Sequence, residues 1–307
     1  MINVQPASYR KFFIDLPIAR LHVLETGKGD PLVMVPATIS ELEDWLSLAQ
    51  FLGQWFRVYF FELPGHGKST PFRERFSSHQ VACLVEQMVD ELGFDRFNLL
   101  GFSFGGILAM RTFERLSARV DRLGLIAPCL GTRALTLSPT RQFWLQQLTK
   151  LLARPAVQAR FHSLARNPRT TPILVKGLQK AGRLEETIPL QRKLGKITAD
   201  TLTVVNAQVQ EILTTEFEVA PIKHEVPCYF AMSIYDPLLH FDVTLNIVHD
   251  HFADVNVARL TYPFHQPPRP FTYEEFNRDL FETVAAFMRA EINRNVPAFP
   301  ALNSGFD

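Results

Sequence analysis

The hydrophobic positions of this chain form short, almost wholly apolar runs that alternate with longer stretches of helical spacing. Such runs predict strands buried on both faces of a parallel sheet. Apolar residues that recur every three or four positions predict amphipathic helices. We expect strands at 32–35, 56–61, 96–101, 120–127, 226–233 and 255–262, and helices at 41–52, 78–92, 105–116, 241–252 and 271–294. This alternation predicts an α/β protein with a mostly parallel central sheet and helices on both faces.

Two local patterns refine the beginning of the chain. Residues 9–16 and 19–25 are β-like stretches joined by a short turn at Pro17, which predicts an antiparallel hairpin. Ser40 is followed three residues later by Glu43, the spacing of a capping box. We therefore expect Ser40 to cap the helix that carries Trp45.

The segment 131–222 differs from the rest in both pattern and charge. It has no strand alternation and several helix-like runs, one of them at 138–153 with Pro139 at the first helical position. Thirteen Lys and Arg residues stand here against six Asp and Glu, whereas the remainder has 19 against 25. We expect a core formed by residues 1–130 and 223–307, with a helical cap, or lid, inserted at 131–222.

One serine lies at a turn that is suited to nucleophilic chemistry. Ser103 follows a predicted strand and precedes a predicted helix, with Gly101 and Gly105 two residues before and after it. Glycines at these positions remove the Cβ atoms that would clash in a sharp strand-to-helix turn. The unpaired N–H groups at the start of the helix favour negative charge, as an oxyanion would require.

A serine hydroxyl needs a neighbouring base and a carboxylate that orients this base. His265 directly follows the last predicted strand, and Asp236 follows the strand before it. Because ligands bind at the carboxyl ends of the strands in such sheets, we expect both side chains to lie near Ser103. Asp242 is the alternative carboxylate. His66 lies in a Gly-His-Gly loop and is expected to be structural, and His249 and His251 fall in a helix and are expected at the surface.

The chain resembles α/β-hydrolases of the lidded kind that includes serine esterases, C–C hydrolases and proline iminopeptidases. The resemblance covers about 19–130 and 223–292 and rests on the serine turn, the order Ser…Asp…His, and the segments Gly27–Val35 and Leu63–Ser69. It implies Ser103 as the nucleophile, His265 as the general base and acid, and Asp236 as the orienting carboxylate. It also implies oxyanion donors at the backbone N–H groups of Phe104 and Thr38.

This sequence departs from the family pattern at three positions. Pro36-Ala37-Thr38 replaces the usual His-Gly motif after the third strand, which puts the donor at Thr38 in question. Phe264 stands where a glycine often precedes the histidine, and Glu62 replaces the usual aspartate, a change that should be mild.

Composition restricts the possible partners. Lys and Arg number 32 and Asp and Glu 31, so no charge bias points to nucleic acid. The first residues lack the order of a signal peptide, and no apolar run approaches the roughly 18 residues of a membrane span, so we expect a cytoplasmic protein. Cys83, Cys129 and Cys228 are far apart, so we expect neither a disulfide framework nor a zinc site. The sequence leaves the oligomeric state open.

The leading hypothesis is a serine hydrolase that cleaves a carboxylic ester or thioester of a small-molecule substrate, with no metal or organic cofactor. Phe102, Phe104 and Phe264 near the predicted site suggest an apolar acyl pocket. A C–C bond hydrolase of the meta-cleavage-product type is the alternative, for which Arg133, Arg141 or Arg192 could bind an anionic substrate. A ligand-binding or signal receptor on the same frame is a third possibility.

Overall fold

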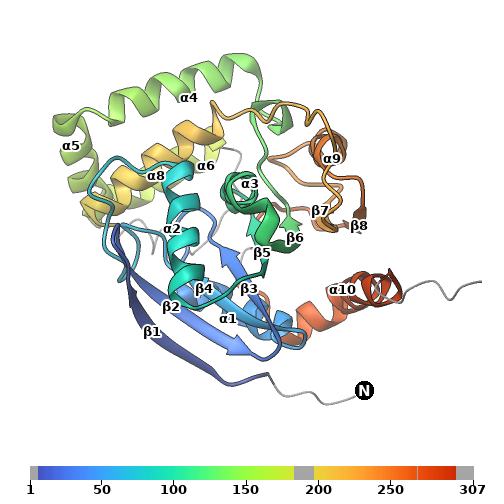
Figure 1. Cartoon of the computed structure of the whole chain (residues 1–307). Coiled ribbons are helices and arrows are strands. Elements are labelled where there is room, and N and C mark those ends of the chain that lie inside the picture. Colours follow the sequence, from blue (N-terminus) through green and yellow to red (C-terminus); the bar gives the residue numbers. More distant parts are fainter. Residues whose placement is uncertain (1–5, 183–196, 268, 295–307) are drawn as a thin grey trace, which may run out of the picture.

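The computed structural model describes residues 6–182, 197–267 and 269–294 of the 307-residue chain. A twisted eight-stranded sheet runs through the molecule in the order β1-β2-β4-β3-β5-β6-β7-β8 (Figure 1). The strands are β1 (Tyr9–Asp15), β2 (Arg20–Gly27), β3 (Asp30–Val35), β4 (Phe56–Phe61), β5 (Phe97–Phe102), β6 (Val120–Ile126), β7 (Cys228–Ser233) and β8 (Val255–Leu260). The pairs β1/β2 and β2/β4 are antiparallel and all others are parallel. The predicted fold class and opening hairpin are confirmed.

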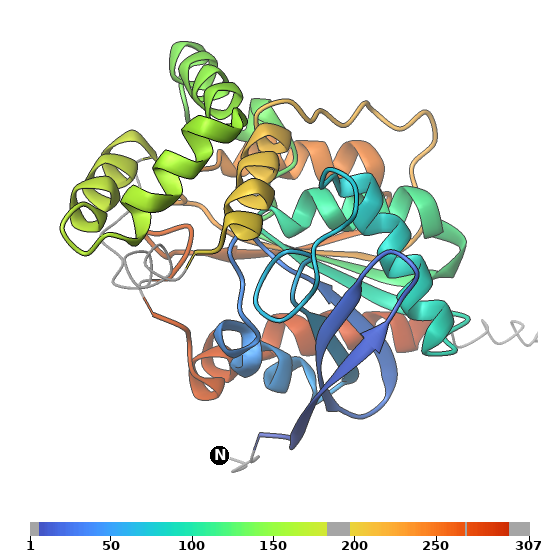
Figure 2. The ribbon, with the colours of Figure 1, turned by 90° about the vertical axis from the view of Figure 1, so that its left-hand side faces the viewer.

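Helices cover both faces of the sheet and form two separate apolar cores. One face packs against α2 (Ser78–Glu91), α3 (Gly105–Leu116) and α9 (Phe241–His251). The other packs against α1 (Leu42–Leu52) and α10 (Tyr273–Arg294). Figure 2 shows α10 below the sheet and α9 above it. Since both faces are buried, the parallel strands need the continuous apolar runs seen in the sequence.

Two local predictions were wrong. The helix α1 begins at Leu42 and is capped by Glu41, whose N–H donates to Asp44 Oδ2 at 3.3 Å. The hydroxyl of Ser40 instead donates to the Ala37 carbonyl at 3.0 Å, and Glu43 pairs with Lys11. His251 is buried rather than at the surface, because its Nδ1 bonds the Ile247 carbonyl at 2.7 Å against the core, whereas His249 is exposed as expected.

Four described helices follow β6 and precede β7 along the chain. In space they lie beyond the carboxyl edge of the sheet (Figures 1 and 2). They are α4 (Pro139–Leu152), α5 (Pro155–Arg166), α6 (Thr171–Gly182) and α8 (Ala199–Ile212), and we call them the insertion helices. The helix α8 joins them to the core. Val204 and Ala207 belong to the larger apolar core, and Thr201 Oγ1 donates to the Gly65 carbonyl at 2.8 Å.

Within the described ranges, no helix has both the length and the hydropathy that a membrane span needs.

Candidate active site

The turn between β5 and α3 holds Ser103 in a conformation that few side chains adopt. Its φ is 54°, in the left-handed region that a non-glycine residue occupies only where the surroundings enforce it. A Cβ at Gly101 would lie 2.1 Å from the Gly105 carbonyl oxygen, and one at Gly105 would lie 2.6 Å from that of Val35. The two glycines therefore allow the close approach of strand and helix that presents the serine hydroxyl at the sheet edge.

The structure brings Ser103, His265 and Asp236 together from three separate strand ends. Ser103 Oγ lies 2.7 Å from His265 Nε2, and His265 Nδ1 lies 2.7 Å from Asp236 Oδ2. Both distances are within hydrogen-bond range. The side chain of Asp236 is 1% exposed and that of His265 is 10% exposed, so the contact between them is shielded from water. Asp242, the alternative carboxylate, is exposed on α9.

Backbone donors fix the direction of the Asp236 carboxylate. Its Oδ1 accepts hydrogen bonds from the N–H groups of Leu238 and Leu239, at 2.8 and 3.0 Å. Oδ2 is thereby turned toward the histidine. A carboxylate there holds the proton of the imidazole on Nδ1 and leaves Nε2 free to accept one from the serine.

The segment Pro36-Ala37-Thr38 passes beside the start of α3. Gly105 lies against the carbonyls of Val35 and Pro36, so Thr38 and Phe104 lie on neighbouring backbone segments. Within the described part of the chain, no hydrogen bond occupies the N–H of either residue. The Ser40 hydroxyl braces this segment through the Ala37 carbonyl. The N–H groups of Phe104 and Thr38 are therefore two donors on neighbouring segments that no other described group occupies.

An apolar cavity of about 120 Å³ lies beside the histidine on the α1 and α10 side of the sheet. Asp236 and His265 border it, and two of the three phenylalanines expected near the site, Phe102 and Phe264, line it. Phe102 lies between Trp45 and His265, with ring centroids 4.7 and 5.9 Å apart. Phe104, by contrast, is fully buried on the opposite face.

Several cavity residues were missed at the sequence level. Tyr262, Phe271 and Phe276 join Phe264 in a cluster of aromatic rings, and Tyr262 stacks on Phe264 at 5.3 Å. The density of aromatic residues within a dozen positions of His265 was the available signal. Nothing in the sequence indicated that they share a cavity with Trp45, because α1 is more than 200 positions away.

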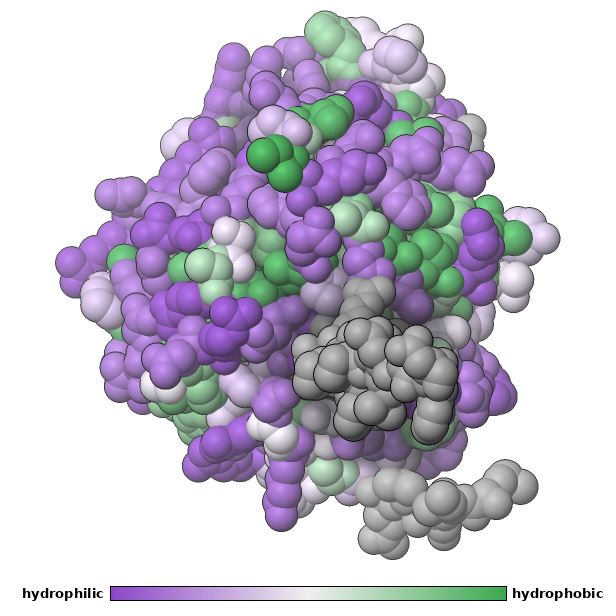
Figure 3. Space-filling model, turned by 45° about the vertical axis from the view of Figure 1, so that its right-hand side comes forward, coloured by the Kyte–Doolittle hydropathy of each residue, from purple (hydrophilic) through white to green (hydrophobic). Residues whose placement is uncertain are grey.

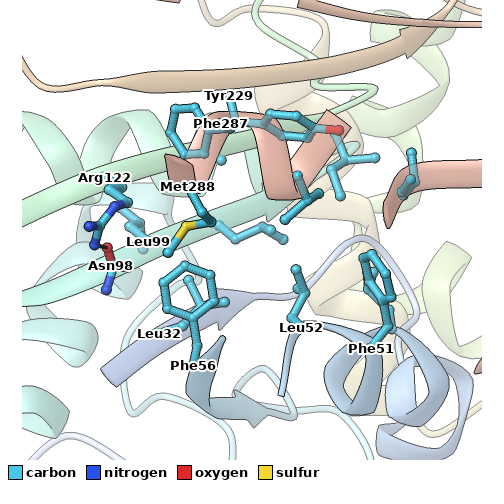
Figure 4. Close-up of a pocket in the computed structure, with 16 residues that line it drawn as sticks. Leu32, Phe51, Leu52, Phe56, Asn98, Leu99, Arg122, Tyr229, Phe287 and Met288 are labelled. Carbon is cyan, nitrogen blue, oxygen red and sulfur yellow. Dashed lines mark hydrogen bonds between the residues drawn. The ribbon is translucent and has the colours of Figure 1, made fainter. Parts of the chain in front are cut away.

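A second, smaller cavity of about 40 Å³ continues deeper between the sheet and the same two helices (Figure 4). It shares Leu48, Ile126 and Leu280 with the first. Figure 4 shows Asn98 and Arg122 together at one end, where the guanidinium donates to Asn98 Oδ1 at 3.0 Å, and apolar side chains over the rest. The two cavities thus leave unfilled space where α1 and α10 pack on β5 and β6.

Glu62 is held in a buried network near the Gly-His-Gly loop. Its Oε2 lies 3.0 Å from His22 Nδ1 and accepts the Lys68 N–H at 2.6 Å. A Cβ at Gly67 would lie 2.2 Å from the Glu62 carboxyl carbon, so the longer side chain fits only because that position is glycine. His66 is buried in this loop and does not line the cavity beside His265.

Of the three arginines considered for an anionic substrate, the two that the structure describes lie away from the lining of the cavity beside His265. Arg133 pairs with Glu216 at 3.2 Å, and Arg141 is exposed on α4. Arg192 lies outside the described residues. Neither Arg133 nor Arg141 lines the cavity.

The nearest thiol is not a competing nucleophile. The Cys129 N–H donates to the Ser103 carbonyl at 2.8 Å, so the two residues are close. Burial raises the pKa of the Cys129 thiol to about 12, which keeps it protonated near neutral pH. All three cysteines are free thiols.

Comparison with known proteins adds to this geometry. The pimeloyl-[acyl-carrier protein] methyl ester esterase of Nitrosomonas europaea is 32% identical over 119 residues, which cover 38% of this chain and 45% of the relative. N-formylmaleamate deformylase of Pseudomonas putida is 28% identical over 127 residues, 41% of this chain and 47% of the relative. The chain therefore spans less than half the length of these curated relatives.

A thermophilic esterase from Thermogutta terrifontis has a similar structure, with a TM-score of 0.61 over 93% of this chain and 98% of the other. At 14% identity, this likeness shows the fold alone. Residues 30–193, more than half of the chain, match the family described as alpha/beta hydrolase fold. With its central sheet, its serine turn and this match, the chain belongs to the α/β-hydrolase fold family.

Proposed function

We propose that this protein is a serine hydrolase that cleaves carboxylic esters or thioesters with a small to medium apolar acyl group. The observation that carries the proposal is the continuous chain of hydrogen-bond distances from Ser103 Oγ through His265 to Asp236, at 2.7 Å for each link. The matched segment of a methyl ester esterase supports ester bonds as the target.

The proposed reaction has two stages. Ser103 Oγ attacks the ester carbonyl while His265 Nε2 takes its proton, and His265 then returns this proton to the departing alcohol. Water, activated by the same histidine, hydrolyses the acyl-enzyme. The N–H groups of Phe104 and Thr38 stabilise the oxyanion in both stages, as such donors do when they point to the developing charge.

The cavity beside His265 is the proposed acyl site. Its walls are mainly apolar, and Phe102 and Phe264 line it together with His265. Burying each additional methylene there would add about 0.8 kcal/mol of binding. Medium-chain esters should therefore be better substrates than acetates. The insertion helices and the rest of 131–222 are the proposed cap over this site.

The test is the variant Ser103→Ala. We expect loss of p-nitrophenyl ester hydrolysis by a factor on the order of 10⁴ or more, and loss of covalent labelling by a fluorophosphonate. Ser163→Ala, which changes an exposed serine on α5, is the matched control and should keep both. Activity retained in Ser103→Ala would refute the proposal.

A substrate panel separates the other two candidates. Esters, thioesters, lactones and a vinylogous 1,5-diketone are offered in parallel. Turnover of the diketone alone would identify a C–C hydrolase. A ligand that raises the melting temperature while the whole panel stays intact would identify a receptor.

A further inference from the structure

The helix α4 exposes four of its six large apolar side chains to solvent. Trp144, Leu148 and Leu151 are spaced by four and three residues, so they form one stripe along the helix. All three are exposed, by 65, 43 and 42%. Phe143 beside the stripe is 52% exposed and packs edge-on against Trp144. In Figure 1, α4 lies at the upper edge of the molecule, far from α10.

The inner side of α4 is held by polar contacts instead. Gln146 Nε2 donates to the Leu213 carbonyl at 2.7 Å, and Asn206 Nδ2 donates to the Thr149 carbonyl at 3.0 Å. Thr149 is buried there and Leu145 packs partly buried against the core, whereas Trp144, the largest side chain of the helix, faces outward with Leu148 and Leu151. A helix that only had to pack on α8 would show the opposite pattern.

The charged residues of the insertion helices α4, α5 and α6 are of one sign only. The segment 139–182, which spans α4, α5 and α6, has eight Lys and Arg residues and no Asp or Glu. They are Arg141, Lys150, Arg154, Arg160, Arg166, Arg169, Lys176 and Lys180. The first seven are exposed, and none of them forms an ion pair with another described residue. Arginines outside the insertion differ in this respect, since Arg96, Arg115 and Arg119 each form an ion pair with a carboxylate.

We propose that α4 docks on the surface of an anionic lipid bilayer, with the stripe Trp144, Leu148 and Leu151 inserted at the level of the headgroups. Exposed aromatic and aliphatic residues with a surrounding of Lys and Arg are the features of interfacial helices. Basic residues near the surface add attraction to anionic lipids. Figure 3 shows hydrophobic groups among hydrophilic ones at the upper end of the molecule.

A second copy of this chain is the less favourable occupant. Two such faces would bring together two clusters of unpaired cations with no carboxylate between them in 139–182. A bilayer that contains anionic lipid supplies both the apolar layer and the opposite charge. The inference is independent of the proposed catalysis, since it uses no residue of the Ser103 site.

The experiment measures binding of the full chain to vesicles of equal parts phosphatidylglycerol and phosphatidylcholine, by co-sedimentation and fluorescence. Trp144 is the one exposed tryptophan of the three, so its insertion should shift the emission to the blue. We expect binding to these vesicles, little binding to pure phosphatidylcholine, and weaker binding at high salt.

Two variants with matched controls test the stripe and the charge. Leu148→Ser/Leu151→Ser should weaken binding by about tenfold or more, whereas Val219→Ser/Ile222→Ser, at even more exposed apolar positions outside α4, should not. Arg141→Glu/Arg154→Glu should abolish the preference for anionic lipid. Both arginines lie at helix N-termini, where glutamate is favourable, so the helices should persist. Lys28→Glu/Lys223→Glu is the control of equal charge.

Three results would overturn the proposal. One is equal binding to both kinds of vesicle, and another is no binding to either. The third is a dimer in light scattering that Leu148→Ser/Leu151→Ser converts to a monomer without vesicle binding, which would assign the face to self-association. Ser103→Ala should bind vesicles like the unchanged protein, so a failure of the hydrolase proposal would leave this result unaffected.

Discussion

The two oxygens of Asp236 have different partners, and these separate its structural role from its proposed catalytic one. Oδ1 accepts two backbone N–H groups of the loop before α9, and Oδ2 faces the histidine ring. A substitution can therefore remove one function and keep the other. Because the Asp236 side chain is almost fully buried, water cannot readily replace a partner that a substitution removes.

We expect Asp236→Asn to keep the fold and lose the activity. The amide oxygen can still accept from Leu238 and Leu239, but an NH₂ group toward His265 favours the wrong tautomer of the ring. Such a change lowers kcat by about 10⁴-fold. Ester hydrolysis and thermal unfolding are measured on the same preparations.

Asp236→Ala and Asp242→Asn complete the comparison. The alanine variant loses the turn as well, so it should be destabilised by about 1–3 kcal/mol in addition. The exposed Asp242→Asn should match the unchanged protein in both measurements. Nearly full activity in Asp236→Asn would contradict the assigned role.

At the level of elements, the start of α10 fixes the loop that carries His265. The Thr272 N–H donates to Glu275 Oε2 at 2.9 Å, and the Glu275 N–H donates to Thr272 Oγ1 at 3.3 Å, which is a capping box. Arg269, four residues after His265, binds both carboxylate oxygens of Glu275, at 2.8 and 2.7 Å. The helix end therefore anchors the loop.

This anchor predicts a dependence on pH. Hydrogen bonds from Arg269, and then from Thr272, lower the pKa of Glu275 from 4.5 to about 2. A carboxylate with a lowered pKa stabilises the fold above its ordinary pKa, and this contribution is lost as the pH falls from about 4.5 toward 2. The difference in melting temperature between the unchanged protein and Glu275→Gln should be constant above pH 5 and shrink below it. Glu274→Gln, one residue earlier, is the control. A difference that is undiminished at pH 2.5 would disprove this account.

At the scale of the whole molecule, charge is separated rather than balanced. The net charge is only +1 and the isoelectric point is about 7.8, yet 139–182 has eight cations and no acidic residue. A molecule polarised in this way presents a local field that its net charge does not reveal.

We therefore expect retention on a cation-exchange column at pH 8 and low salt, where the net charge is close to zero. Arg141→Glu/Arg154→Glu should elute at a clearly lower salt concentration than Lys28→Glu/Lys223→Glu, although both change the charge equally. Identical elution of the two variants would show that the cluster does not act as a unit.

Much of the fold was predictable because its signals are local. The apolar runs identified all six core strands, and helical spacing found α2, α3, α9 and α10 within two residues of their ends. The glycines around Ser103 indicated the turn because a strand that packs tightly on a helix leaves no room for Cβ atoms. The order Ser103, Asp236, His265 then followed from the position of each residue at a strand end.

Only the tertiary structure decided features that depend on distant segments. The cap of α1 was misassigned because Ser40 with Glu43 and Glu41 with Asp44 have the same capping-box spacing. The contacts of Ser40 with Ala37 and of Glu43 with Lys11 leave Glu41 and Asp44 to form the cap. Burial of His251 depends on the core against α9, and the cavity beside His265 joins Trp45 to residues from β8 and α10. For α4, the sequence predicted a helix at 138–153 but not which of its apolar side chains would face solvent. Spacing fixes which residues share a helix face, but the rest of the fold determines whether that face meets the core or solvent.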